Sequence, residues 1–162
     1  MSEDLQIARG TKAEQYAALL PQIRALMEGE RDGVANLANV AAALKEQFGW
    51  LWVGFYLIKD GELVVGPFQG PVACTRIRKG RGVCGTSWAE DRTLIVPDVE
   101  SFPGHIACSS LSRSEIVVPI RAGQTIIGVL DADSDKRNAF DEEDQRWLET
   151  LVAQLPGITD VG

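Results

Sequence analysis

The sequence predicts a single α+β domain, in which an antiparallel sheet carries helices packed on one face. Three observations support this class: two amphipathic segments stand near the N-terminus, β-branched and aromatic segments fill the middle, and another amphipathic segment closes the chain. A length of 162 residues is typical of one domain with one hydrophobic core. No internal repeat or low-complexity stretch divides the chain, so we expect residues 1–162 to form one domain.

The two N-terminal segments have the apolar periodicity of helices. In residues 11–27, apolar side chains recur at three- and four-residue steps, which places them on one helix face. Pro21 lies inside this pattern and predicts that the helix ends or kinks there. Residues 32–48 carry a second apolar stripe, and Gly49 predicts the end of that helix.

Short strands with clear turn signals follow. Strand composition is found in residues 50–58, 62–65, 93–96, 114–120 and 125–131. Asp60-Gly61 predicts a hairpin between the first two of these strands, and Pro97 ends the third. Ala122-Gly123 predicts the turn between the last two.

Two long loops and two further helices complete the predicted fold. Residues 66–82 contain four glycines and two prolines, and residues 101–113 are polar, so we expect a loop in each. Residues 83–90 are predicted as a short helix. Residues 140–155 form the last predicted helix, with Asp141 as its N-cap.

The charge balance excludes several classes of protein. The chain has 16 basic and 23 acidic residues, a formal net charge of −7, which argues against binding to nucleic acid or to anionic lipid. No apolar run approaches the roughly 18 residues of a membrane span. The first ten residues lack the pattern of a signal peptide. We therefore expect a cytoplasmic protein with neither a nucleic acid nor a membrane as partner.

Three cysteines are the clearest chemical feature. Cys74, Cys84 and Cys108 are too few for a disulfide scaffold, and all lie in or beside the two long loops, where functional residues often occur. They form no Cys-x-x-Cys pair, and His105 is the single histidine, so we expect no metal site. His105 lies in a predicted loop, where we expect a solvated imidazole. The distribution indicates a thiol-based role, with buried inert thiols as the alternative.

Acidic side chains cluster in the two last predicted strands. Asp131 and Asp133 alternate at a strand end, so both should point to one face, and Glu115 opens the neighbouring strand. Antiparallel pairing would bring the three carboxyls together and raise at least one pKa, which leaves a protonated carboxyl able to donate a hydrogen bond. In the alternative, Asp133 caps a turn and Glu115 is solvated.

Two other patterns give no functional prediction by themselves. The glycine-rich residues 78–85 lack the Gly-Lys-Ser/Thr ending of a phosphate-binding loop. The first predicted strand is aromatic, a composition most often found in a core; its aromatic side chains are Trp50, Trp52, Phe55 and Tyr56.

Several of these motifs together resemble one known family. The runs WVGFYL, GPFQGPVACTRI, GRGVCGTS, VPDVESFPGHIACSS, SRSEIVVPI and GVLDADS resemble the free methionine-(R)-sulfoxide reductases, which are built on a GAF domain. The resemblance covers residues 5–155. It implies a GAF-like fold, with a central antiparallel sheet and flanking helices, and a homodimer.

The resemblance also implies a reaction that uses the thiols and no cofactor. A thiolate, which corresponds to Cys108, attacks the sulfoxide sulfur; methionine leaves and the cysteine becomes a sulfenic acid. A second thiol converts the sulfenic acid to a disulfide, and thioredoxin reduces that disulfide. Cys74 and Cys84 are both candidates for the second thiol; Cys74 is favoured because its segment is rich in chain breakers and Cys84 opens a helix.

The same resemblance implies roles for the acids and aromatic residues. Glu115 and Asp133 would supply the proton that the sulfoxide oxygen needs. Asp131 would help to bind the substrate ammonium. Trp52 would contact the substrate methyl group, and Tyr56 would border the same pocket.

Backbone N–H groups complete the implied substrate site. Those of residues 106–108, which include Ile106 and Ala107, would hold the substrate carboxylate. Recognition of both charged ends would explain selection of the free amino acid. The competing reading is a GAF-type regulatory module that binds a small ligand, in which the three thiols would have no use.

Overall fold

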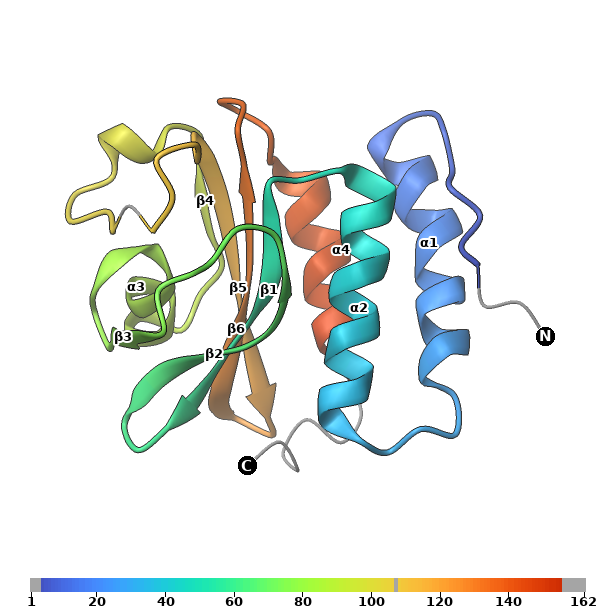
Figure 1. The fold of residues 1–162 in the computed structure, drawn as a ribbon, viewed down its shortest axis with the longest axis horizontal. Coiled ribbons are helices and arrows are strands. Elements are labelled where there is room, and N and C mark those ends of the chain that lie inside the picture. Colours follow the sequence, from blue (N-terminus) through green and yellow to red (C-terminus); the bar gives the residue numbers. More distant parts are fainter. Residues whose placement is uncertain (1–3, 107, 156–162) are drawn as a thin grey trace.

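A six-stranded antiparallel sheet forms the centre of residues 4–106 and 108–155, the part of the chain that the computed structural model describes (Figure 1). In sheet order the strands are β3 (Arg76–Arg78), β2 (Glu62–Gln69), β1 (Trp52–Lys59), β6 (Thr125–Ser134), β5 (Ser114–Ala122) and β4 (Leu94–Val96). The predicted α+β class with a central antiparallel sheet is confirmed. Asp60 and Gly61 both have positive φ, 53° and 78°, as the tight hairpin between β1 and β2 requires.

Helices cover both faces of this sheet. On one face, α2 (Gly33–Phe48) and α4 (Glu142–Val152) pack against strands and α1 (Lys12–Met27) packs outside them (Figure 1). On the other face, α3 (Gly82–Glu90) contacts β5 and β6. The expectation that helices pack on one face is therefore wrong for α3, because β5 and β6 bury side chains on both faces and both need cover. Among the described residues, no helix is long and apolar enough to cross a membrane.

Local capping residues fix the helix ends. Thr11 forms a capping box with Glu14 at the start of α1, and Asp141 caps α4 as predicted. Gly49 ends α2 in the left-handed conformation, with φ of 65°. Pro21 does not end the first helix, contrary to one of the two predicted outcomes, because α1 continues to Met27. Pro21 is exposed, so its ring faces away from the apolar side that holds α1 on the domain.

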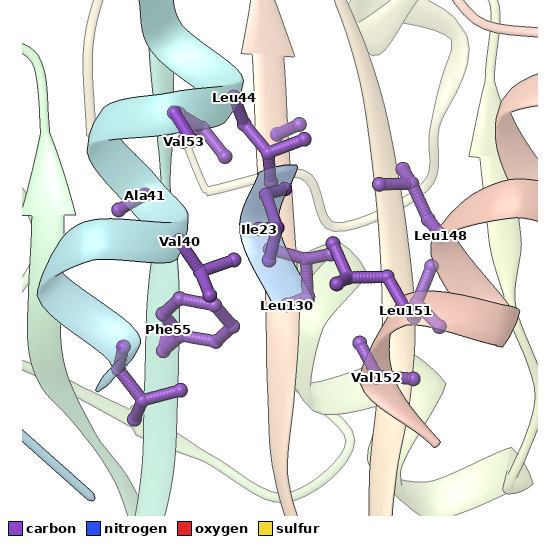
Figure 2. Packing of buried hydrophobic residues seen from close by; sticks show 14 of the residues in the cluster. Ile23, Val40, Ala41, Leu44, Val53, Phe55, Leu130, Leu148, Leu151 and Val152 are labelled. Atoms are coloured by element: carbon purple, nitrogen blue, oxygen red, sulfur yellow. The ribbon is translucent and has the colours of Figure 1, made fainter. Parts of the chain in front are cut away.

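Alternate side chains of β1 enter two separate cores. Val53 and Phe55 join the larger core, where Figure 2 shows them with Val40 of α2 and with side chains of β6 and α4. Trp52 and Tyr56 point to the opposite face and join a smaller core beside α3. The chemical groups singled out in the sequence gather on this second face.

The predicted loop over residues 66–82 is partly wrong, because it contains the end of β2 and all of β3. Gly66 and Pro67 form a bulge in β2 opposite Phe55, between the pairs Gly54–Phe68 and Tyr56–Val65. The pairing with β3 does not extend this far along β2. A proline is tolerated there because no strand pairs with this part of β2 on the β3 side, so its missing N–H group interrupts no hydrogen bond between strands. Gly54 is required at the bulge, since a Cβ atom would lie 2.7 Å from the Cα of Phe68.

Candidate active site

A disulfide between Cys74 and Cys108 joins the two long loops on the α3 side of the sheet. The Cα atoms are 5.5 Å apart, although 34 positions separate the residues in the sequence. Cys74 lies between β2 and β3 and is half-buried, and Cys108 precedes β5 and is exposed. The disulfide thus links Cys108 to the favoured of its two candidate partners.

The disulfide borders a cavity of about 60 Å³. Its lining includes most of the residues singled out in the sequence: Trp52, Tyr56, Cys84, Ile106, Cys108, Glu115, Asp131 and Asp133. Cys74 reaches the cavity through its bond to Cys108. Ala107, the remaining candidate, lies outside the described residues.

Three carboxyl groups meet in this cavity because of the register between β5 and β6. Glu115 stands opposite Asp133, and Val117, two residues further along the same face, stands opposite Asp131. β6 runs to Ser134, three residues beyond its predicted end, so Asp133 belongs to the strand. Glu115 and Asp131 are each only 6% exposed. The expected gathering of the acids is confirmed, and the alternative of a solvated Glu115 and a turn-capping Asp133 is wrong.

Burial raises the pKa of all three carboxyls, and their mutual repulsion adds to the effect. After burial, the next cause is Asp133 for the pKa of Glu115, Glu115 for that of Asp131, and Asp131 for that of Asp133. The raised pKa values mean that the cluster retains protons which an ordinary carboxylate would have lost. It is therefore able to donate a proton to a bound oxygen atom.

We expect Glu115→Gln to increase the free energy of unfolding at neutral pH, because the raised pKa of Glu115 makes its ionised form costly in the folded protein. Because the folded-state pKa of Glu115 is raised, the native protein binds this proton more tightly than the unfolded chain. Stability therefore falls as pH rises from the unfolded-state pKa through the folded-state pKa. The neutral amide removes this loss.

Urea unfolding of wild type and Glu115→Gln, at neutral pH and below about pH 4, measures the effect. The gain should be present at neutral pH and absent in acid, where the wild-type carboxyl is protonated in both states. Glu46→Gln, on an exposed position of α2, is the matched control and should change little. A Glu115→Gln variant no more stable than wild type at neutral pH would contradict the raised pKa.

Trp52 and Tyr56 position the loop that carries Cys74. The indole Nε1 of Trp52 donates a hydrogen bond to the carbonyl of Pro71 at 3.1 Å. The hydroxyl of Tyr56 donates to the carbonyl of Cys74 itself at 2.9 Å. The Trp52 ring also stacks on Phe68, with centroids 5.1 Å apart. The aromatic residues thus line the cavity and also fix the backbone of one disulfide cysteine.

Cys84 is the third thiol of the cavity and differs from the other two. It lies in α3 and is only 4% exposed. Burial raises the pKa of the Cys84 thiol, and the carboxyls of Asp131 and Glu115 raise it further, so the thiol is neutral and a poor nucleophile. Gly85 lets this part of α3 lie close to β3, because a Cβ atom there would be 2.4 Å from the carbonyl oxygen of Arg78 in β3.

His105 and Ser112 are cavity residues that the sequence reasoning missed. The expectation of a solvated His105 is wrong: its side chain is 15% exposed, and its Nε2 lies 3.8 Å from Oε1 of Glu115. Burial lowers the pKa of His105, which favours the neutral imidazole. Ser112 donates a hydrogen bond to Oδ1 of Asp133 at 3.4 Å. Proximity to Cys108 in the sequence was the one signal for both.

The backbone beside Cys108 is engaged in the disulfide state. The N–H of Cys108 donates to the carbonyl of Ile106 at 3.1 Å. This N–H group is therefore available to a substrate carboxylate only after the loop rearranges.

Comparisons with known proteins identify relatives over nearly the whole chain. Residues 35–155, which include every cavity residue named above, match the model of the GAF domain. GAF domain-containing protein A of Dictyostelium discoideum is 65% identical over 156 residues, 96% of this chain and 99% of that protein. The free methionine-R-sulfoxide reductase of Escherichia coli is 50% identical over 145 residues, 89% of this chain and 88% of that protein.

A solved structure gives the same result. The free methionine-R-sulfoxide reductase from Neisseria meningitidis, in complex with its substrate, superposes with a TM-score of 0.94 at 53% identity. The match covers 98% of this chain and 96% of that one.

Proposed function

This chain belongs to the GAF-domain family and, within it, to the free methionine-(R)-sulfoxide reductases, and we propose that it reduces free methionine-(R)-sulfoxide to methionine. The observation that carries the proposal is the disulfide between Cys74 and Cys108 at the edge of a cavity that also holds three carboxyls of raised pKa. Thiol-dependent reduction of a sulfoxide needs a nucleophilic thiol, a second thiol and a proton for the oxygen atom. The cavity contains all three.

In the first step, the thiolate of Cys108 attacks the sulfoxide sulfur. The sulfur–oxygen bond of the substrate breaks, the oxygen ends on Cys108 as a sulfenic acid, and methionine leaves. The substrate gains two electrons and Cys108 loses two. Glu115 and Asp133 supply the proton that the oxygen takes up, because both carboxyls face the cavity and both have a raised pKa.

In the second step, the thiol of Cys74 attacks the sulfenic sulfur of Cys108, water leaves, and the disulfide forms. Exchange with the dithiol of thioredoxin then returns both cysteines to thiols. Cys74 suits this role because it lies on a loop beside Cys108. Cys84 suits it less, since its neutral thiol is held in α3.

Recognition of the free amino acid uses both ends of the substrate. Oδ1 of Asp131 is buried without a hydrogen-bond partner among the described residues, and it is assigned to the substrate ammonium. Trp52 contacts the methyl group, and Tyr56 borders the pocket. Once the disulfide is reduced and the loop rearranges, N–H groups from Ile106 to Cys108 hold the carboxylate.

The protein is further proposed to act as a homodimer in a reducing compartment such as the cytoplasm. A reducing compartment is required because each cycle consumes one dithiol reductant. Light scattering after size-exclusion chromatography measures the oligomeric state; a monomer at working concentration would contradict the dimer.

The activity is tested by following NADPH oxidation in the presence of thioredoxin and thioredoxin reductase. We expect turnover with free methionine-(R)-sulfoxide and none with the S epimer or with the R sulfoxide inside a peptide. Binding of a small ligand without turnover of the R epimer would overturn the proposal in favour of a GAF-type regulatory module.

We expect Cys74→Ser to keep one fast stoichiometric turnover and to slow thioredoxin-coupled cycling. The sulfenic acid still forms on Cys108, and only its conversion to a disulfide is lost. Rapid-quench measurement of methionine, compared with the steady-state rate, separates the two steps.

Cys84→Ser is the matched variant for this experiment, because it removes the other candidate thiol. It should cycle at close to the wild-type rate. If Cys84→Ser instead shows the single turnover and Cys74→Ser cycles normally, the role of second thiol belongs to Cys84.

A further inference from the structure

We propose that the cavity also binds a thiophilic divalent cation of the Zn²⁺ class, with Cys84, Glu115 and Asp131 as ligands. The three residues come from α3, β5 and β6. Each residue offers one donor atom, and these three atoms, one sulfur and two carboxyl oxygens, lie within 4.8 Å of one another. Ligand atoms on one zinc ion stand about 3–4 Å apart, given metal–ligand distances of about 2.0–2.3 Å. Small side-chain rotations therefore suffice to close the three around one ion.

A second and independent observation points to a bound cation. Oδ1 of Asp131 is fully buried and has no hydrogen-bond partner among the described residues, in a side chain that is only 6% exposed. A buried acceptor without a partner is destabilising. A cation at the donor set of Cys84, Glu115 and Asp131 would satisfy this oxygen directly.

The charges around the cavity also favour a cation. Glu115, Asp131 and Asp133 line it, and among the described residues His105 is the only basic side chain that does so. Nε2 of His105 lies 3.8 Å from Oε1 of Glu115 but does not belong to the set of donor atoms that lie within 4.8 Å of one another. A divalent ion would balance two of the three carboxylates.

The donor atoms select the class of metal. A thiolate together with carboxylates suits Zn²⁺ or Co²⁺, whereas Mg²⁺ and Ca²⁺ prefer oxygen ligands alone. Cys84 takes no part in the disulfide, so its thiol remains available in the oxidised protein. The sequence spacing did not predict this site, because its ligands come from three separate elements.

Binding of the ion has a consequence for the proposed reaction. Asp131 and Glu115 cannot serve the substrate and the metal at once, so Zn²⁺ should inhibit reduction by competing with methionine sulfoxide. This consequence rests on the proposed function, but the metal site itself does not. The two are tested by separate measurements.

The test of the site uses Co²⁺ and the oxidised protein, in which Cys84 is the single free thiol. We expect a thiolate-to-cobalt charge-transfer absorption that saturates at one ion per chain and disappears when Zn²⁺ is added. Cys84→Ser should lose the absorption, and Asp131→Asn should weaken Co²⁺ binding by about 10-fold or more, as expected for loss of one ligand. Glu46→Gln, an exposed carboxyl on α2, is the control and should bind as wild type does.

Absence of the absorption in oxidised wild type, or equal Co²⁺ binding by Cys84→Ser, would overturn the site. Near-ultraviolet circular dichroism establishes whether each variant is folded. If Cys84→Ser does not fold, Co²⁺ binding by Asp131→Asn still tests the site. In the thioredoxin assay, Zn²⁺ should raise the apparent KM for the sulfoxide, and a chelator should reverse this. A protein without reductase activity would refute the proposed function and leave the cobalt spectrum unaffected.

Discussion

Cys108→Ser is expected to abolish reduction of methionine-(R)-sulfoxide, in cycling and in a single turnover without reductant. A serine hydroxyl is not ionised at neutral pH and does not attack the sulfoxide sulfur as a thiolate does. Two thiols remain in this variant. Burial and neighbouring carboxyls keep Cys84 neutral, and Cys74 is not among the residues that line the cavity, so neither substitutes for Cys108. Cys108, by contrast, is exposed at the cavity.

The measurement is methionine formed per protein chain after mixing fully reduced enzyme with the R sulfoxide. Wild type and Cys84→Ser should each give a rapid stoichiometric burst, and Cys108→Ser should give none. A burst from Cys108→Ser would transfer the role of nucleophile to Cys84. Thermal unfolding of the three proteins establishes that a lost burst reflects lost chemistry rather than lost fold.

Glu115→Gln and Asp133→Asn are each expected to lower the rate of sulfoxide reduction by roughly 10²–10⁴-fold, the usual contribution of a positioned general acid. The register of β5 and β6 sets the two carboxyls opposite each other at the cavity. Each amide occupies nearly the same volume, but it has no acidic proton to give to the leaving oxygen. The same Glu115→Gln change should stabilise the fold, so stability and activity should move in opposite directions.

Single-turnover methionine formation, measured against pH, tests this expectation. In wild type, the rate should fall as pH rises through the raised pKa of the donor carboxyl, and the amide variants should lose that dependence. Glu46→Gln should react as wild type does. Wild-type rates in both amide variants would remove these carboxyls from the chemistry and assign the proton to water or another group.

Local signals in the sequence were sufficient for most of the fold. The Asp60-Gly61 turn and the cap at Asp141 act within a few residues, and apolar periodicity predicts the two N-terminal helices. Residues 66–69 of β2 are typical of a loop in the sequence, because glycine and proline are usually chain breakers. Their acceptance in β2 depends on a bulge and on the absence of pairing with β3 at that point, which only the assembled sheet determines.

The site divides in the same way. Asp131 and Asp133 alternate on one strand, and a single turn joins that strand to the one that begins near Glu115. These two signals are enough to predict that the three acids meet. The burial of His105 is not predictable from the sequence, because it depends on a loop conformation that brings the side chain to within 3.8 Å of Glu115. The proximity of Cys84 to the carboxyls likewise depends on the placement of α3 on the second face of the sheet.

The most direct test of the proposed reaction is the stoichiometry of one turnover by the reduced enzyme without any reductant. The mechanism predicts one methionine formed from the R sulfoxide for each disulfide formed, with peptide mapping locating that disulfide between Cys74 and Cys108 and Cys84 remaining a free thiol. The S sulfoxide should produce neither methionine nor disulfide. Methionine formed without loss of the Cys108 thiol, or a disulfide formed without methionine, would contradict the mechanism.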